Sequence, residues 1–119
     1  MRLFVKSVGF AMEGLIALYK SERNARIHTG IALVVLTLAL ILQVTAIEFC
    51  LLVLMFGVVL SMEAANTAIE KICNMYTKEI DPRVKVIKDL GAAAVLLAGI
   101  AAIVIGLVLL IPYIIRLFQ

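Results

Sequence analysis

The chain has 119 residues, of which 65% are hydrophobic and only 16% are charged, and its mean hydropathy is +1.17. Soluble domains are roughly 45–50% apolar, so this chain has too few charged groups to coat a soluble globule and too many aliphatic residues to be disordered. The net charge of +3 is small, and the length suits one domain spanning 1–119, so we expect an all-α integral membrane protein.

The first predicted element is an amphipathic surface helix over 2–27. At 100° per residue, four charged side chains fall within a sector of about 40°. They are Arg2, Lys6, Glu13 and Lys20. The opposite side is apolar, with Phe4, Val8, Leu15, Leu18 and Tyr19. A helix with Lys and Arg on its polar face is typical of a segment that lies in the membrane surface.

The sequence allows two conformations of the chain at Glu22. If the surface helix continues past this residue, the carboxylate lies beneath the apolar stripe and points toward the membrane spans. If the helix instead ends at Ser21, Glu22 is a solvated cap. His28 is the lone histidine, and with no evident partner it is interpreted as structural.

Three apolar runs are long enough to cross a bilayer, which needs about 20 apolar residues. They predict transmembrane helices over 30–47, 49–70 and 88–115. So little chain separates the first two that they must form a tight antiparallel hairpin.

Lys and Arg set the orientation of these spans. Ten of the eleven cationic residues precede the first span or lie between the second and the third. The positive-inside rule therefore predicts a cytoplasmic N-terminus and 71–88 loop, with the C-terminus outside. Because topology accounts for the basic charge, we expect no nucleic-acid partner.

The second span carries polar residues at membrane depth, where each ionisable group costs roughly 2.5–3.5 kcal/mol and needs a reason. Glu63, Asn66 and Glu70 fall within about 60° on one helix face. A row of carboxylate, amide and carboxylate offers the hard oxygen atoms that magnesium prefers. Alternatively, Asn66 could simply bond across a helix interface and Glu70 could be a solvated helix end.

The third span opens with Lys88, Asp89 and a run of small residues that includes Ala92. Lys88 could be a plain membrane anchor. Facing two carboxylates, however, it suggests a phosphate clamp, in which lysine and magnesium together neutralise the oxygens of a nucleotide. No GxxxxGK[ST] loop or GxGxxG motif is present, so ATP would be bound without the usual phosphate cradle.

Three stretches of the chain resemble one known family in order and spacing. Residues 63–70, EAANTAIE, resemble the E-x-x-N-[ST]-A-I-E motif of the small bacterial diacylglycerol kinase and undecaprenol kinase family. Lys88 and Asp89, with the Gly/Ala run, resemble its second motif. Residues 22–28, ERNARIH, resemble a stretch of its undecaprenol kinase branch. The resemblance covers nearly the whole chain.

The resemblance implies a bacterial inner-membrane homotrimer with shared active sites, which transfers the γ-phosphoryl group of MgATP to the hydroxyl of a lipid. It assigns the general base to Glu63. The implied magnesium ligands are Glu22, Glu70 and Asn66. The implied ATP contacts are Lys88, Asp89, Glu79 and Phe10. The residues implied to contact the lipid substrate are Glu63, Arg26 and Ala92.

Two residues depart from the family pattern. Asn74 stands where many members have Asp, and Phe10 stands where some have a Tyr that stacks on the nucleotide. The resemblance implies that the acceptor is undecaprenol or diacylglycerol, and the Glu22–His28 stretch favours undecaprenol. Two other classes of function stay open from the residues alone: a non-catalytic membrane subunit whose polar residues lock helices together, and a small ion carrier.

Overall fold

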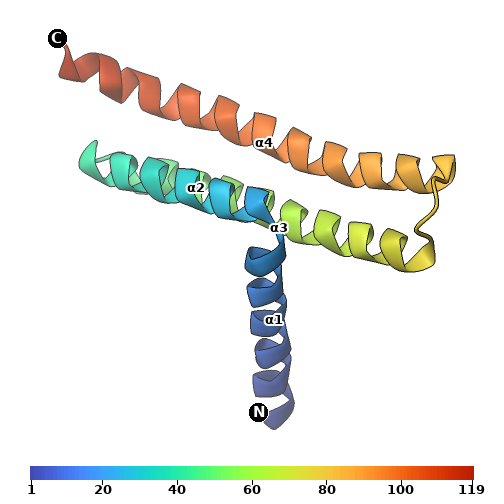
Figure 1. Cartoon of the computed structure of the whole chain (residues 1–119). Helices are drawn as coiled ribbons and strands as arrows, with labels where there is room; N and C mark the ends of the chain where they lie inside the picture. The colour runs from blue at the N-terminus through green and yellow to red at the C-terminus, as the bar shows by residue number, and fades with distance from the viewer.

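The computed structural model describes all 119 residues and contains four α-helices and no strand. The helices are α1 (Arg2–Ser21), α2 (Arg23–Ile41), α3 (Ala46–Tyr76) and α4 (Pro82–Leu117), as Figure 1 shows. Three of them, α2, α3 and α4, are long and apolar enough to cross a membrane. The predicted fold class is therefore confirmed.

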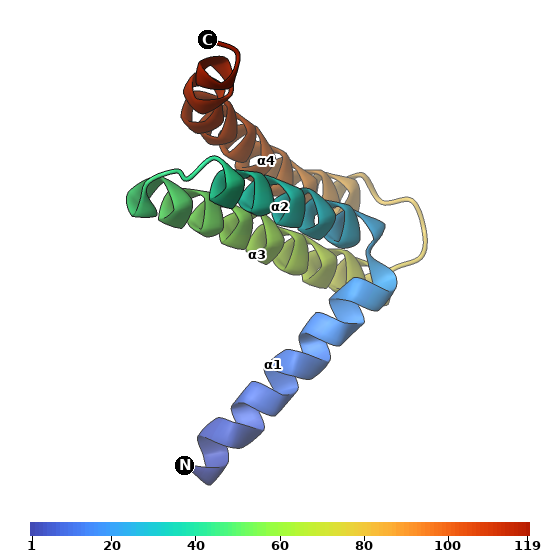
Figure 2. The same ribbon diagram turned by 90° about the vertical axis from the view of Figure 1, so that its left-hand side faces the viewer.

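The long helix α3 is the centre of the structure. Helix α2 lies along its first part and α4 runs back along it in the opposite direction. Helix α1 projects sideways from this bundle, as Figures 1 and 2 both show. With the three spans upright in a bilayer, α1 lies along the membrane surface, in agreement with its amphipathic pattern.

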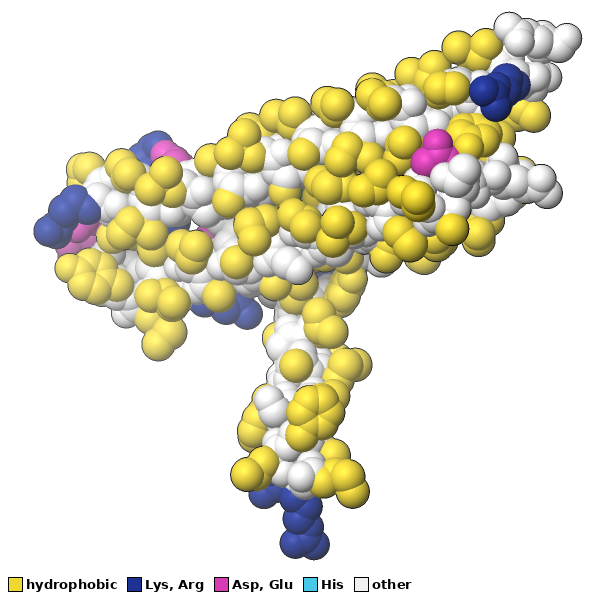
Figure 3. All heavy atoms as spheres, turned by 180° about the vertical axis from the view of Figure 1, so that it is seen from behind, with side chains coloured by type: hydrophobic (Ala, Val, Ile, Leu, Met, Phe, Trp, Pro, Cys, Tyr) yellow, Lys and Arg dark blue, Asp and Glu magenta, His cyan; other side chains and the backbone are white.

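The apolar surface faces outward. Only 13 of the 119 residues are buried, and the core cluster contains just Ala39, Leu52 and Leu110. Figure 3 shows hydrophobic side chains over the visible face of the spans, with Lys and Arg at the end that carries the α3–α4 connection, at the free end of α1 and near the C-terminus of α4. Such a distribution suits a protein whose outer surface meets lipid rather than water.

The prediction of one surface helix over 2–27 is wrong beyond Ser21. Glu22 is extended (φ −107°, ψ 113°), ending α1 and preceding α2. The corner is held by side chains on both helices: Arg26 Nη1 donates to the Tyr19 carbonyl (2.7 Å), and the hydroxyls of Tyr19 and Thr29 share a hydrogen bond (2.7 Å). The helix that contains most of the first predicted span, 30–47, therefore begins at Arg23.

The other helices also differ from their predicted bounds, because their ends are set by capping rather than by hydropathy. The α2–α3 hairpin is as tight as predicted, and α3 begins with a capping box in which Thr45 and Glu48 satisfy each other's backbone N–H groups. Asp81 caps α4, with Pro82 at its first position. Helices α3 and α4 thus both extend past the predicted 49–70 and 88–115.

Candidate functional site

The predicted base is the most deeply buried charged side chain of the protein. Glu63 on α3 is 3% exposed. Its Oε1 lies 3.0 Å from Nδ1 of His28 on α2, which is ion-pair distance. The contact does not meet hydrogen-bond geometry, and neither atom has any other hydrogen-bond partner. The interpretation of His28 as a residue without a partner is therefore wrong.

Asn66 lies one turn and Glu70 two turns beyond Glu63 on α3, and these two residues contact each other. Asn66 Nδ2 donates to Glu70 Oε1 (3.3 Å), and both residues are partly buried. Asn66 Oδ1 is buried without a hydrogen-bond partner and lies against Gly91 of α4. A Cβ atom at Gly91 would lie 2.4 Å from that oxygen, so the absent side chain of glycine makes the space that Asn66 occupies.

The first turns of α4 supply the predicted nucleotide contacts. Lys88 Nζ donates to Asn74 Oδ1 of α3 (2.6 Å), so the lysine is held by a neutral amide at the position where many family members have Asp. Asp89 is exposed and pairs with Lys85, one turn earlier on the same helix. The structure thus places Lys88 between α3 and α4, with Asp89 on the outer side of α4.

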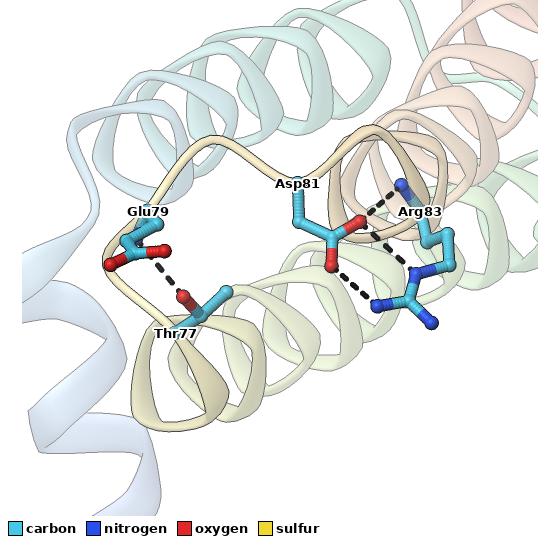
Figure 4. Close-up of polar contacts among 4 residues, drawn as sticks. All are labelled: Thr77, Glu79, Asp81 and Arg83. Atoms are coloured by element: carbon cyan, nitrogen blue, oxygen red, sulfur yellow. Dashed lines mark hydrogen bonds and ion pairs between the residues drawn. The ribbon is translucent and has the colours of Figure 1, made fainter.

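The connection between α3 and α4 carries Glu79. Its backbone N–H donates to Thr77 Oγ1 (3.0 Å), and Figure 4 shows its carboxylate away from the Asp81–Arg83 pair. Arg83 donates to Asp81 from its guanidinium (2.8 and 3.2 Å) and from its backbone N–H (2.8 Å). These bonds hold the pKa of Asp81 below its usual value. Glu79 stays exposed and without such a partner.

The remaining predicted residues are spread over α1, the corner between α1 and α2, α2 and α4. Arg26 bonds the last carbonyls of α1, which places its charge at that helix C-terminus. Phe10 is exposed on α1, and Ala92 is exposed on α4. Glu22 is half-buried at the corner between α1 and α2, so it is neither deeply buried nor a fully solvated cap.

No group of three or more His, Cys, Asp and Glu side chains lies close enough to hold a metal within this chain. A magnesium ion that arrives with a nucleotide needs only one or two carboxylates, because phosphate oxygens and water complete its coordination. The touching pair of Glu70 and Asn66 offers a carboxylate and an amide, the donor types that this ion prefers. The residues present therefore fit a nucleotide-bound magnesium ion.

An apolar cavity of about 280 Å³ opens between the three spans, on the side of Glu63 that faces the α2–α3 hairpin. It is lined from α2 by Ile31 and Val35, from α3 by Leu52 and Phe56, and from α4 by residues that include Gly106. Phe56 and Leu52 lie roughly 10 and 16 Å along α3 from Glu63, at 1.5 Å per residue. The small residues Ala92–Ala94 and Gly99 of α4 do not line this cavity.

Sequence reasoning missed the contact of His28 with Glu63, although a signal was available. In a tight antiparallel hairpin, residues equally far from the connection lie side by side. His28 and Glu63 are equally far from the Thr45–Ala46 bond, and so are Ala39 and Leu52, which share the core cluster. The predicted hairpin alone could have placed the members of each pair at the same level, although not the rotation that turns their side chains toward each other.

Comparison with known proteins gives consistent matches along the chain. A model of the family described as prokaryotic diacylglycerol kinase matches residues 9–110. The undecaprenol kinase of Bacillus subtilis is 32% identical over 109 residues, which cover 92% of this chain and 89% of the relative. The diacylglycerol kinase of Escherichia coli K12 is 32% identical over 106 residues, covering 89% and 87%.

A diacylglycerol kinase of Synechocystis is 36% identical over 107 residues, which cover 89% of this chain. They cover 61% of that relative, so this chain spans less than two thirds of its length. The matched range 9–110 contains every site residue named above, from Phe10 to Ala92.

Proposed function

The chain belongs to the prokaryotic diacylglycerol kinase family and is a membrane lipid kinase, and from this premise we propose how its residues divide the reaction. ATP is the phosphate donor, and the acceptor is the hydroxyl of undecaprenol or diacylglycerol. The observation that carries the proposal is a carboxylate, Glu63, buried at membrane depth on the same helix as the Asn66–Glu70 pair.

Glu63 acts as the general base. The lipid hydroxyl oxygen attacks the γ-phosphorus, its bond to phosphorus forms, and the bond from phosphorus to the β,γ-bridging oxygen breaks, so that ADP leaves. Glu63 takes the hydroxyl proton. Its place on α3 supports this role, since a base for a lipid headgroup must lie within the membrane rather than in the aqueous loop.

Glu70, Asn66 and Glu22 hold magnesium with the nucleotide. When bound, the ion neutralises charge on the phosphates. The Asn66–Glu70 hydrogen bond supports this assignment, because it fixes the orientation of the Glu70 carboxylate from one turn away. Lys88 contacts phosphate oxygens, with Asp89, Glu79 and Phe10 completing the nucleotide site.

Glu70→Gln is expected to raise the KM for MgATP roughly 10- to 100-fold, because an amide replaces the charged ligand of the metal. The measurement is a steady-state titration of MgATP at several free magnesium concentrations. We expect excess magnesium to reduce the loss of affinity. Glu13→Gln on the polar face of α1 is the control for removing a carboxylate. A Glu70→Gln protein with the parent KM at every magnesium concentration would remove Glu70 from the metal site.

The lipid lies along α3 with its hydroxyl near Glu63. Arg26 and Ala92 line the inner end of its path, and the apolar cavity between the spans takes part of its chain. Two features favour undecaprenol over diacylglycerol: the Glu22–His28 stretch and an almost wholly hydrophobic cavity wall, which suits a polyisoprenoid chain. Polar groups that could read the ester carbonyls of diacylglycerol are few at this level.

Purified protein tests this function directly. The two acceptors are compared side by side in identical mixed micelles, with MgATP, and the phosphorylated lipid is separated and quantified. We expect phosphate transfer to both, faster to undecaprenol. A clear preference for diacylglycerol would reverse the acceptor, and transfer to neither lipid would contradict the assignment of both.

The topology follows from the placement of the cations: the N-terminus and the 71–88 loop are cytoplasmic, and the C-terminus is outside. We expect Ala46→Cys and Gln119→Cys, each in a chain lacking Cys50 and Cys73, to react with an impermeant thiol reagent in intact cells. Lys78→Cys is the control that should stay protected. Protection at 46 and 119 with labelling at 78 would invert the orientation.

Homotrimerisation completes the site. A single chain buries only 13 of its 119 residues, and the cavity between its three spans is only partly enclosed. Neighbouring subunits would cover the site beside Asn66 and Glu70, which are only partly buried in one chain. We expect native mass measurement in mild detergent to give three copies, and an active monomer would contradict this.

A further inference from the structure

The pair of His28 and Glu63 is the only polar contact between α2 and α3 deep in the bundle. Oε1 of Glu63 and Nδ1 of His28 are both buried, and each lacks any other polar partner. A buried charged oxygen without a partner is costly, so the two atoms satisfy each other or neither is satisfied. Other atoms of the imidazole are accessible, because the His28 side chain as a whole is 31% exposed.

The contact needs only a small adjustment to become a hydrogen bond. Its length, 3.0 Å, is already that of an N–H···O bond, and only its alignment falls short. Catalytic hydrogen bonds are often poorly aligned in substrate-free sites and tighten when substrate binds. With a carboxylate oxygen opposite Nδ1, the ring must carry its proton on that nitrogen to act as the donor.

We infer that His28 is a positioning residue for the base: its Nδ1–H holds Oε1 of Glu63, so that Oε2 is left to take the proton of the lipid hydroxyl. The inference rests on the proposed role of Glu63. A base oriented by a third group is the arrangement that makes proton abstraction efficient in many enzymes. Here the base and its partner come from two helices whose packing fixes both side chains.

The position of His28 in the fold strengthens this role. It lies one residue before Thr29, whose hydroxyl bonds that of Tyr19, and two residues after Arg26, which bonds the end of α1. The corner that sets the direction of α1 therefore also sets the start of α2 and the height of His28 against Glu63. Throughout the reaction His28 keeps its Nδ1 proton, and Glu63 alone gains the proton of the hydroxyl.

Replacement of His28 separates positioning from packing. His28→Leu keeps the bulk and removes the donor, whereas His28→Asn places an amide N–H close to the position of Nδ1. We expect His28→Leu to lower kcat roughly 10- to 100-fold, the usual effect of removing a partner that orients a ligand or base, with the KM for MgATP unchanged. His28→Asn should restore most of the loss. Thr37→Val, on α2 about two turns beyond His28, removes a hydroxyl that bonds only its own helix and should keep kcat.

The assay uses the full chain in mixed micelles with MgATP and each of the two acceptors, and Glu63→Gln is measured beside it. Parent-like kcat in His28→Leu with an inactive Glu63→Gln would overturn the role of His28 alone. An active Glu63→Gln would overturn the base assignment, and this inference with it. If His28→Leu fails to assemble, His28→Asn is compared with His28→Gln, whose amide lies one carbon further out. A faster Asn variant supports positioning, and equal rates overturn it.

Discussion

Glu63→Gln is expected to lower turnover by about 10²- to 10⁴-fold, the range that a general base contributes, while MgATP binding stays close to that of the parent. Glutamine has the shape of glutamate, but its amide cannot accept the proton of the lipid hydroxyl at the attacking step. The nucleotide contacts lie one to two turns further along α3 and at the start of α4, so they keep their partners. Turnover and nucleotide affinity should therefore separate.

The measurement is kcat with saturating lipid, together with equilibrium binding of MgATP to the same preparation. Glu48→Gln is the matched control, since Glu48 is a carboxylate on the same helix at its opposite end, where it caps α3 and accepts a hydrogen bond from Tyr113 (2.6 Å). That control should keep kcat and lose some thermal stability. A Glu63→Gln protein with near-parent turnover would remove Glu63 from the chemistry.

Gly91→Ala is expected to be the most damaging of the seven possible Gly→Ala changes, because Gly91 is the one glycine whose added Cβ would meet a neighbour within 4 Å. The new Cβ would lie 2.4 Å from Asn66 Oδ1, which is too close for any contact, and 3.6 Å from Ile69 Cδ1, which is ordinary packing. Either Asn66 swings away and loses its bond to Glu70, or α4 moves off α3. Overpacking of this kind costs about 1–3 kcal/mol of the free energy of unfolding. The displaced Asn66 should also lower kcat/KM for MgATP.

The same helix provides the control, because Gly99 has no atom within 4 Å of the position where a Cβ would be. Gly99→Ala should be neutral or slightly stabilising, since alanine is the better helix former. Adding Asn66→Ala to Gly91→Ala should relieve the clash and recover thermal stability without recovering activity. Unchanged thermal stability and kcat/KM in Gly91→Ala would show that the space beside Gly91 is not required.

The composition and the one-dimensional pattern determined the class of the protein, its three spans, the tight hairpin and the amphipathic α1. These features depend on hydropathy and on the period of a single helix. Both can be read from a segment of sequence without knowing what the segment packs against. The same is true of the stripe of Glu63, Asn66 and Glu70, because the positions of residues around one helix follow from their spacing.

Contacts between helices needed the tertiary structure. The end of α1 at Ser21 carries no glycine or proline signal, and the corner is held instead by Arg26 and Tyr19 reaching across it. Spacing along a chain states which residues share a face, but the rotation and crossing of two packed helices decide which faces meet. That rotation places His28 against Glu63, Asn66 against Gly91 and Lys88 against Asn74.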